Sequence, residues 1–213
     1  MAIEQRPQRH KTKERREEIL RIASKLFADK GYDGASLNDV ASQMGISKAA
    51  LYHHIQNKEE ILREIIEGKL NQAIKDTRQI VNSDLSPKDK LRWFIRAVVK
   101  GITTDRYVMR NLFENTASLS EDAKKAIIEH KKAFDHQLQL LLEEGMEKGY
   151  FHIDNVKMAV FVIQGACNFC YQWYHDDGKL SPEEIAENFI CLLERGYLER
   201  NSDSPVIQMQ NRD

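Results

Sequence analysis

The amino-acid sequence predicts an all-α protein, with a small three-helix domain at residues 13–60 and a larger helical domain at residues 61–200. Three observations favour this fold class. Apolar residues recur at three-and-four spacing along most of the chain, two of the four prolines stand at helix starts, and no strand-like pattern appears. We therefore expect about nine helices in total.

The composition indicates a folded cytoplasmic protein. The 213 residues are 41% hydrophobic and 31% charged, which is ordinary for a globular chain. The segment 1–16 is polar and basic where a signal peptide needs apolar residues, and no apolar run is long enough to span a bilayer. Three cysteines, an odd number, do not make a disulfide framework, so we expect free thiols.

The small domain, called the head below, carries the signals of a helix-turn-helix. Its first helix is expected over residues 13–30. A second helix begins at Ser36, whose hydroxyl can cap it, with Asp39 where a capping box normally has Glu or Gln. Gly45 can then adopt the left-handed conformation that ends a helix, and Ser47 caps a third helix.

The third helix of such a head lies in the major groove of DNA. Leu51 and Ile55 lie on its inward face, while Lys48 and His53 lie on its outward face and are candidates for base readout. Hydroxyls and lysines at helix starts suit phosphates, because unpaired backbone N–H groups attract anions there. The residues expected to contact DNA are Ser36, Leu37, Ser47, Lys48, Ala49, Ala50, Tyr52, His53 and Lys58. Taken alone, Tyr52 is equally well explained as a surface tyrosine packed on the second helix.

A short basic arm, residues 6–16, leads into the first helix, and Glu14 is its one acidic residue. The positive charge suits an anion, although charge alone favours a solvated tail. The arm residues that are candidates for DNA contact are Arg6, Arg9, Lys11 and Arg15.

The larger domain continues the helical pattern. A fourth helix begins at Asn57 and runs well past the head, so it is the expected connector. Prolines in the first turn mark helix starts at Ser86-Pro87 and Ser181-Pro182. The remaining helices are expected near residues 107–117, over 121–148 and over 155–174, and the last helix ends near residue 198.

Two groups of apolar residues in the larger domain indicate partners. The helices after residue 155 are too apolar for a monomer, which predicts a four-helix interface between two copies. Its candidate residues are Ile163, Cys167, Trp173, Ile185, Phe189 and Leu192. A ligand pocket is expected between the other helices, lined by Phe94, Val98, Ile102, Tyr107, Phe113, Phe134, Leu138 and Phe161. For any one of these, an ordinary core position is the alternative.

No catalytic, cofactor or metal site is expected. Cys167 and Cys170 form a C-x-x-C pair, but a structural zinc site needs a second such pair, so we interpret them as buried thiols. Acidic and histidine residues between 152 and 177 offer an enzyme as the alternative. They fall at helix ends, where capping explains the acidic residues, and no nucleophile elbow, phosphate-binding loop or HExxH motif is present.

A resemblance to a known family runs through the head. The stretch of residues 16–62, REEILRIASKLFADKGYDGASLNDVASQMGISKAALYHHIQNKEEIL, strongly resembles the DNA-binding head of the TetR family of bacterial repressors. The matching positions are Ile19, Ala23, Leu26-Phe27, Gly31-Tyr32, Ser36, Val40-Ala41, Gly45-Ile46-Ser47, Leu51-Tyr52, His54, Lys58-Glu59 and Leu62. Two positions differ from the family pattern: Ala49-Ala50 stand where the family often has Gly-Thr, and Ile55 stands where it usually has Phe. Such differences change operator preference more readily than they change the fold.

The resemblance implies a homodimer whose two heads meet successive major grooves of operator DNA. It also implies that a ligand in the second domain spreads the heads apart. Family members often lay the residues before the first helix along or into the minor groove, which gives the basic arm a role.

The stretch of residues 168–198 is similar to the end of TetR-family regulators of fatty-acid, aromatic-acid and steroid catabolism that respond to acyl-CoA thioesters. The positions that match are Asn168, Trp173-Tyr174, Asp177-Gly178 and residues 181–185, while Phe169 replaces a tryptophan. This implies a repressor released by a small hydrophobic effector such as an acyl-CoA, with Arg106 and Arg110 at the pocket mouth. The alternatives are a multidrug-sensing repressor of the same family and an effector-independent DNA-binding protein.

Overall fold

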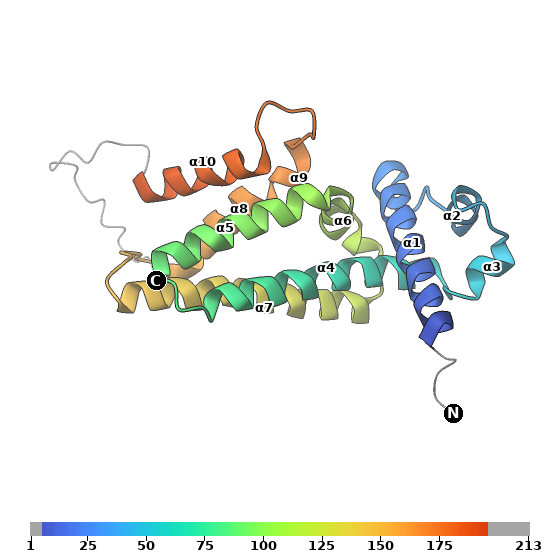
Figure 1. The fold of residues 1–213 in the computed structure, drawn as a ribbon, viewed down its shortest axis with the longest axis horizontal. Coiled ribbons are helices and arrows are strands. Elements are labelled where there is room, and N and C mark those ends of the chain that lie inside the picture. The colour runs from blue at the N-terminus through green and yellow to red at the C-terminus, as the bar shows by residue number, and fades with distance from the viewer. Residues whose placement is uncertain (1–5, 196–213) are drawn as a thin grey trace, which may run out of the picture.

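The computed structural model describes residues 6–195, and the side chains of residues 12–194. Figure 1 shows α1, α2 and α3 gathered at one end, with longer helices running lengthwise through the rest of the molecule. Between residues 6 and 195 there are ten α-helices and no strand. The predicted all-α class is therefore confirmed. No helix in this range combines the length and apolar character needed to cross a membrane.

The head consists of α1 (Arg6–Lys30), α2 (Leu37–Gln43) and α3 (Lys48–Tyr52). The predicted capping box is present, because the Ser36 hydroxyl accepts from the Asp39 N–H at 3.2 Å and the Asp39 carboxylate accepts from the Ser36 N–H at 2.8 Å. Gly45 has the left-handed φ of 64° at the turn. The Ser47 hydroxyl accepts from the Ala50 N–H at 3.1 Å and so begins α3.

Helix α1 starts earlier than predicted, at Arg6 instead of Lys13. Arg, Lys, Gln and Glu are good helix formers, and the Lys13 ammonium lies 3.7 Å from the Glu17 carboxylate one turn on. Residues interpreted as an arm before the helix are therefore its first turns. The side chains of Arg6, Arg9 and Lys11 lie outside the described residues, so their contacts with DNA stay predictions.

Helix α4 (Lys58–Val81) joins the head to the larger domain without a break. Ile61 and Leu62 are fully buried where α4 contacts α1, and Leu70 is buried further along the same helix. The helix is continuous across residue 60, so the division into residues 13–60 and 61–200 stays a prediction.

The larger domain is a helical bundle. Helices α5 (Pro87–Thr104), α7 (Glu121–Glu147) and α8 (Val156–Asn168) pack around its core with α4. Helix α10 (Pro182–Arg195) packs on α5. The short elements are α6 (Arg106–Arg110), a π-helical turn (Asn111–Asn115), a 3-10 turn (Thr116–Ser118) and α9 (Cys170–Trp173).

Two predicted helices are divided in the structure. The one expected near residues 107–117 is α6 followed by the π-helical and 3-10 turns, and the one expected over 155–174 is split into α8 and α9. At the second break the Gln172 N–H bonds the Phe169 carbonyl three residues back instead of four. At the end of α7, the Phe151 ring lies so close to Gly145 that an added Cβ would approach it within 2.1 Å.

Candidate functional site

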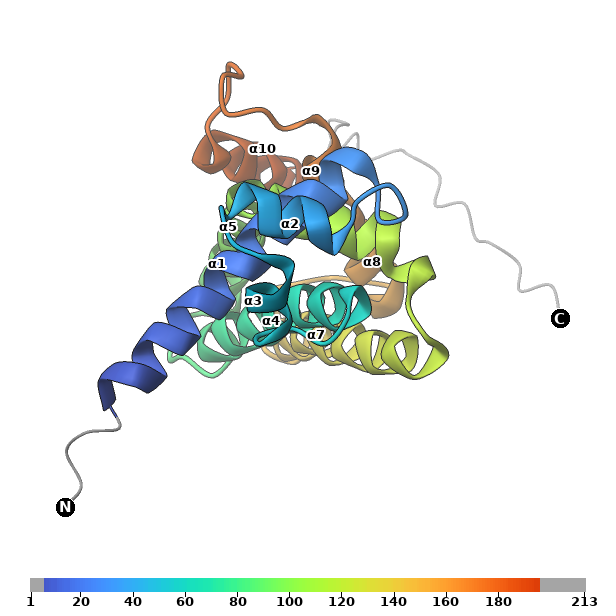
Figure 2. The same cartoon turned by 90° about the vertical axis from the view of Figure 1, so that its right-hand side faces the viewer.

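Helix α3 divides its residues between the core and the surface. Figure 2 looks onto the head, with α3 on the near side. Leu51 is fully buried. The outward residues Lys48, Ala49, Tyr52 and His53, called the α3 face below, are exposed. Tyr52 keeps 45% of its surface accessible, so packing against the second helix does not bury it.

The other residues expected to contact DNA surround this face. Ser36 and Ser47 are exposed at the starts of α2 and α3, while Leu37 and Ala50 are partly buried. Contact between these residues and DNA stays a prediction.

Lys58, at the start of α4, packs against aromatic rings. Its ammonium lies 4.0 Å from the centroid of the Tyr32 ring and 5.7 Å from that of Phe27. The Phe27 and Tyr32 rings meet edge to face with centroids 5.4 Å apart. Burial lowers the pKa of Lys58, against the opposing charge of Asp33. The rings thus hold a cation where α4 begins, a contact that sequence spacing does not show.

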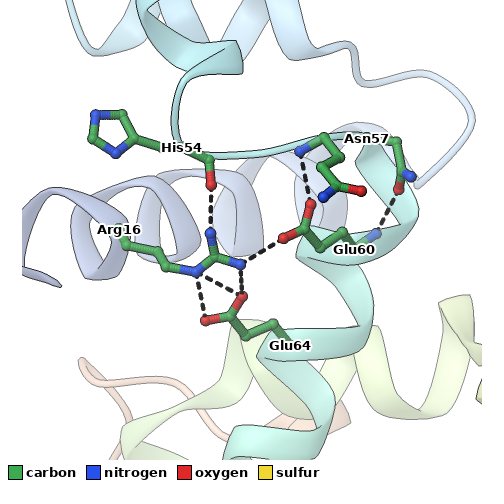
Figure 3. A network of polar contacts seen from close by, with 6 residues as sticks. Arg16, His54, Asn57, Glu60 and Glu64 are labelled. Atoms are coloured by element: carbon green, nitrogen blue, oxygen red, sulfur yellow. Dashed lines mark hydrogen bonds and ion pairs between the residues drawn. The ribbon is translucent and has the colours of Figure 1, made fainter. Parts of the chain in front are cut away.

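Arg16 forms a polar network that sequence analysis missed (Figure 3). Its guanidinium donates from Nε to both carboxylate oxygens of Glu64, each at 3.0 Å, and from Nη2 to Glu60 at 2.6 Å. Nη1 donates to the carbonyl oxygen of His54. The second oxygen of Glu60 accepts from the Gln56 N–H at 2.7 Å. The sequence placed Arg16 in a basic run at the start of the first helix and indicated none of these partners.

The Arg16 network joins three parts of the chain. Arg16 belongs to α1, His54 and Gln56 to the segment that follows α3, and Glu60 and Glu64 to α4. The hydrogen bonds that Arg16 donates to Glu64 and Glu60 raise its pKa. Partial burial alone would raise the pKa of Glu60, but the Arg16 hydrogen bond and nearby backbone N–H groups leave it lowered. Both partners therefore stay charged at neutral pH, and the network fixes α4 relative to α3.

A cavity of about 320 Å³ lies between α4, α5, α7 and α8. Five of the predicted lining residues face it: Val98, Ile102, Phe113, Phe134 and Phe161. Helix α8 also lines this cavity, although the pocket was expected between the helices that precede residue 155, and contact of these residues with a ligand stays a prediction.

Four predicted pocket residues lie elsewhere. Phe94 and Leu138 are fully buried core residues, and the Phe94 ring packs on Phe134 at 5.7 Å between centroids. Tyr107 lies under the Lys25 ammonium, toward α1. Arg110 is exposed and binds Glu114 at 2.9 Å, one turn along the chain. Arg106, expected beside it at the mouth, is also outside the cavity lining and lies 3.9 Å from Asp176.

Sequence analysis missed the polar part of the cavity wall, because polar residues on a helix are ordinarily assigned to solvent. These residues are Lys69, Gln72, Asp76 and Thr77 on α4, Lys131 and Asp135 on α7, and Gln164 and Asn168 on α8. The Lys131 ammonium lies 5.3 Å from the centroid of the Phe113 ring, which stacks on Tyr171 at 4.9 Å.

The π-helical turn touches both the cavity and the head. Asn111 is fully buried, and its amide nitrogen donates to the Ser24 carbonyl of α1 at 2.8 Å. Its amide oxygen accepts from Asn115 at 2.7 Å, and Asn115 also donates to the Phe27 carbonyl of α1 at 3.3 Å. Leu112 and Phe113, from the same turn, line the cavity.

Large apolar side chains of α8, α9 and α10 are exposed in the single chain. These exposed side chains are called the α8–α10 face below. They are Met158, Phe161 and Val162 on α8, Phe169 between α8 and α9, Trp173 on α9, and Leu192 and Leu193 on α10. Trp173 and Leu192 were predicted at a dimer interface, and Phe189 is half-buried. Ile163, Cys167 and Ile185 differ from that prediction, because they are buried inside the single chain.

The cysteines show no metal-ligand arrangement. Burial raises the pKa of Cys167 to about 12 and that of Cys170 to about 11, so both are protonated at neutral pH. Cys191 is exposed. No group of three His, Cys, Asp or Glu side chains within the described part of the chain is placed to hold a metal ion.

Two family models match the chain. Residues 19–65 match bacterial regulatory proteins of the tetR family, and residues 84–197 match the tetracyclin repressor-like C-terminal domain. The HTH-type transcriptional repressor KstR2 of Mycolicibacterium smegmatis is 26% identical over 192 residues, which cover 89% of this chain and 93% of that repressor.

Solved structures share the fold over nearly their whole length. The TetR family transcriptional regulator PfmR from Thermus thermophilus has a TM-score of 0.80 and 33% identity, covering 85% of this chain and 99% of PfmR. AibR, solved in complex with isovaleryl coenzyme A and operator DNA, has a TM-score of 0.75 and 28% identity, covering 84% of this chain and 97% of AibR.

Proposed function

The chain belongs to the TetR family of bacterial transcriptional regulators, and on this premise we propose that it is a dimeric repressor released from operator DNA by an acyl-CoA thioester. The observation that carries the proposal is the α3 face, which presents Lys48, Tyr52 and His53 outward from a helix-turn-helix. Such a protein acts on DNA in the cytoplasm as a binding module, not as an enzyme.

The α3 face accounts for DNA binding by two kinds of contact. Lys48 at the start of α3 and His53 directly after it are exposed donors on the element expected to enter the major groove, and Ala49 allows close approach to a thymine methyl. Ser36, Ser47 and Lys58 stand at helix starts, where backbone N–H groups and the helix dipole favour phosphate. Because Lys58 already lies against Tyr32, that ring holds its ammonium at the head instead of leaving it free to rotate.

The two kinds of contact predict different variants. Tyr52→Ala and Lys58→Ala are expected to weaken binding to every DNA sequence, because a phosphate contact is lost. For Lys58→Ala, the slope of the logarithm of the binding constant against the logarithm of the salt concentration should fall in magnitude by about one. Lys48→Ala is expected to relax sequence preference. Gel-shift titrations at two salt concentrations measure both effects, and Lys75→Ala, an exposed lysine far along α4, is the control. Wild-type binding by Tyr52→Ala and Lys58→Ala would contradict the placement of this surface.

The α8–α10 face supports the dimer. Val162 is 58% exposed and Phe169 is 61% exposed, and with Met158 they recur at helical spacing along one stripe; exposed large apolar residues of this kind normally mark an interface. A two-fold axis through this face would bury the same residues on both copies. The interface proposed here uses these exposed residues in place of Ile163, Cys167 and Ile185, which the chain already buries.

The cavity supports a hydrophobic effector. Its volume is at the low end for small-molecule sites, so it suits an acyl group and the adjoining thioester, with the nucleotide of coenzyme A outside. It extends to Gln72 and Asp76 on α4, which are exposed outside the α8–α10 face and so give a path to the surface. The AibR complex with isovaleryl coenzyme A and operator DNA supports this ligand class by similarity.

Two contacts are available to carry the effect of the ligand to the head. Helix α4 lines the cavity with Lys69 and Asp76 and holds Arg16 at its other end. The π-helical turn lines the cavity with Phe113 and bonds α1 through Asn111. A ligand that prefers one arrangement of these helices shifts the protein toward it and changes the spacing of the heads.

A further inference from the structure

Gln164 is a buried polar residue without an internal partner. Its side chain is 6% exposed, and within the described part of the chain neither its amide nitrogen nor its amide oxygen has a hydrogen bond. Burial of an unpaired amide is costly, because the group loses its hydrogen bonds to water. The residue lies on α8 in the wall of the cavity. A donor and an acceptor therefore stand unused beside the space that a ligand would fill.

The charges around the cavity balance. Lys69 and Lys131 supply two positive charges to the wall, and Asp76 and Asp135 supply two negative ones. Lys69 is engaged, since it donates to the Gly101 carbonyl at 2.8 Å and to Asp105 at 2.6 Å. Burial lowers the pKa of Lys131 and raises that of Asp135, so the surroundings of both groups favour the uncharged form more than water does. This wall does not favour a net anion inside the cavity.

From these two observations we propose that Gln164 selects the effector, by binding an uncharged group that offers both a hydrogen-bond acceptor and a donor. An acyl-pantetheine has such a group. Its thioester carbonyl can accept a hydrogen bond from the Gln164 amide nitrogen, and the N–H of the amide nearest the thioester can donate to the Gln164 amide oxygen. A free carboxylate offers acceptors alone, which leaves the Gln164 oxygen unpaired and places a charge in a balanced site. This inference rests on the proposed function and narrows its ligand to the thioester.

Three probes with the same eight-carbon chain separate these cases: octanoyl-pantetheine, methyl octanoate and sodium octanoate. Calorimetric titration of the full-length protein is expected to rank them in that order of affinity. Gln164→Leu keeps the approximate size and removes both polar groups, so it is expected to lower the affinity for octanoyl-pantetheine about tenfold and that for methyl octanoate less. Gln137→Leu, a buried glutamine outside the cavity lining, is the matched control and should leave the ranking unchanged.

The melting temperature gives a second, ligand-free readout. Because Gln164 is unpaired without ligand, Gln164→Leu is expected to melt at or above the wild-type temperature. A lower melting temperature would show that Gln164 is a partnered structural residue and would overturn the proposal. Octanoate binding as tightly as octanoyl-pantetheine, binding of none of the probes, or an unchanged ranking in Gln164→Leu would overturn it as well. The gel-shift titration of the α3 variants remains the separate test of the DNA-binding function.

Discussion

Replacement of both Val162 and Phe169 by aspartate is expected to give a folded monomer that binds operator about a hundredfold more weakly than the wild type. Both side chains are exposed on the α8–α10 face, so the single chain tolerates the charges. In the dimer the same charges would be buried without partners, which costs several kcal/mol. Loss of the second head then removes the gain in effective concentration that two linked heads provide. Sedimentation equilibrium and circular dichroism measure assembly and folding separately.

The control for that experiment is Leu140→Asp. Leu140 is 41% exposed on α7, outside the α8–α10 face, so this variant should remain dimeric. A dimer in the double variant, or a monomeric wild type at micromolar concentration, would contradict the proposed interface. The choice of residues matters, because Ile163→Asp would put a charge into the core and unfold the chain instead of separating two copies.

Arg16→Met is expected to lower the free energy of unfolding by about 2 kcal/mol, since hydrogen bonds to charged groups contribute roughly that much when they are partly buried. Arg16 is 33% exposed, which reduces the effect below that of a fully buried pair. The variant leaves Glu60 and Glu64 side by side without a cation and frees the carbonyl of His54 beside α3. We therefore also expect operator affinity to fall about tenfold, a loss that follows from a loosened recognition helix.

Urea unfolding and fluorescence anisotropy with operator DNA measure the two effects of Arg16→Met. Arg63→Ala is the matched control, because Arg63 pairs with Glu67 on the exposed side of the same α4 and should change neither quantity by much.

The pKa of Glu60 is lowered in the folded state, so the Arg16–Glu60 pair stabilises the protein at pH values above 4.5, the ordinary pKa of glutamate. This stabilisation is lost as the pH falls through the lowered pKa. The difference between wild type and Arg16→Met should therefore shrink in that acid range. A constant difference across it would contradict the ion-pair explanation.

Local signals made the helix starts predictable from the sequence. Ser36, Ser47 and Ser86 each accept a hydrogen bond from the backbone N–H three residues further on, as the capping pattern indicates. The inward and outward residues of α3 were also predictable, because helical spacing alone separates Leu51 from Tyr52. The start of α1 was missed, since a basic run has no apolar face to reveal its periodicity.

Contacts between distant parts of the chain were not predictable from the sequence. Arg16 and Glu64 are 48 residues apart, and neither residue type at its position indicates the other. Helical periodicity also does not distinguish a core position from a cavity wall, as Phe94 and Phe134 show by packing together while only Phe134 lines the cavity. On α8, Val162 and Ile163 are adjacent and equally apolar, and only the placement of α5 and α7 decides which one is buried.

The most direct test of the central claim is the affinity for operator DNA measured with and without acyl-CoA. Operator duplexes are first selected from random DNA by the wild-type dimer, and their dissociation constants are then determined by fluorescence anisotropy at fixed salt. We expect a selected sequence with two related half-sites, and an affinity that falls about a hundredfold, or roughly 2.7 kcal/mol, with the best of a panel of fatty-acyl and aryl-CoA thioesters. No sequence enrichment, or an affinity that every thioester leaves unchanged, would contradict the proposed function, and release by hydrophobic drugs alone would replace the thioester with a multidrug effector.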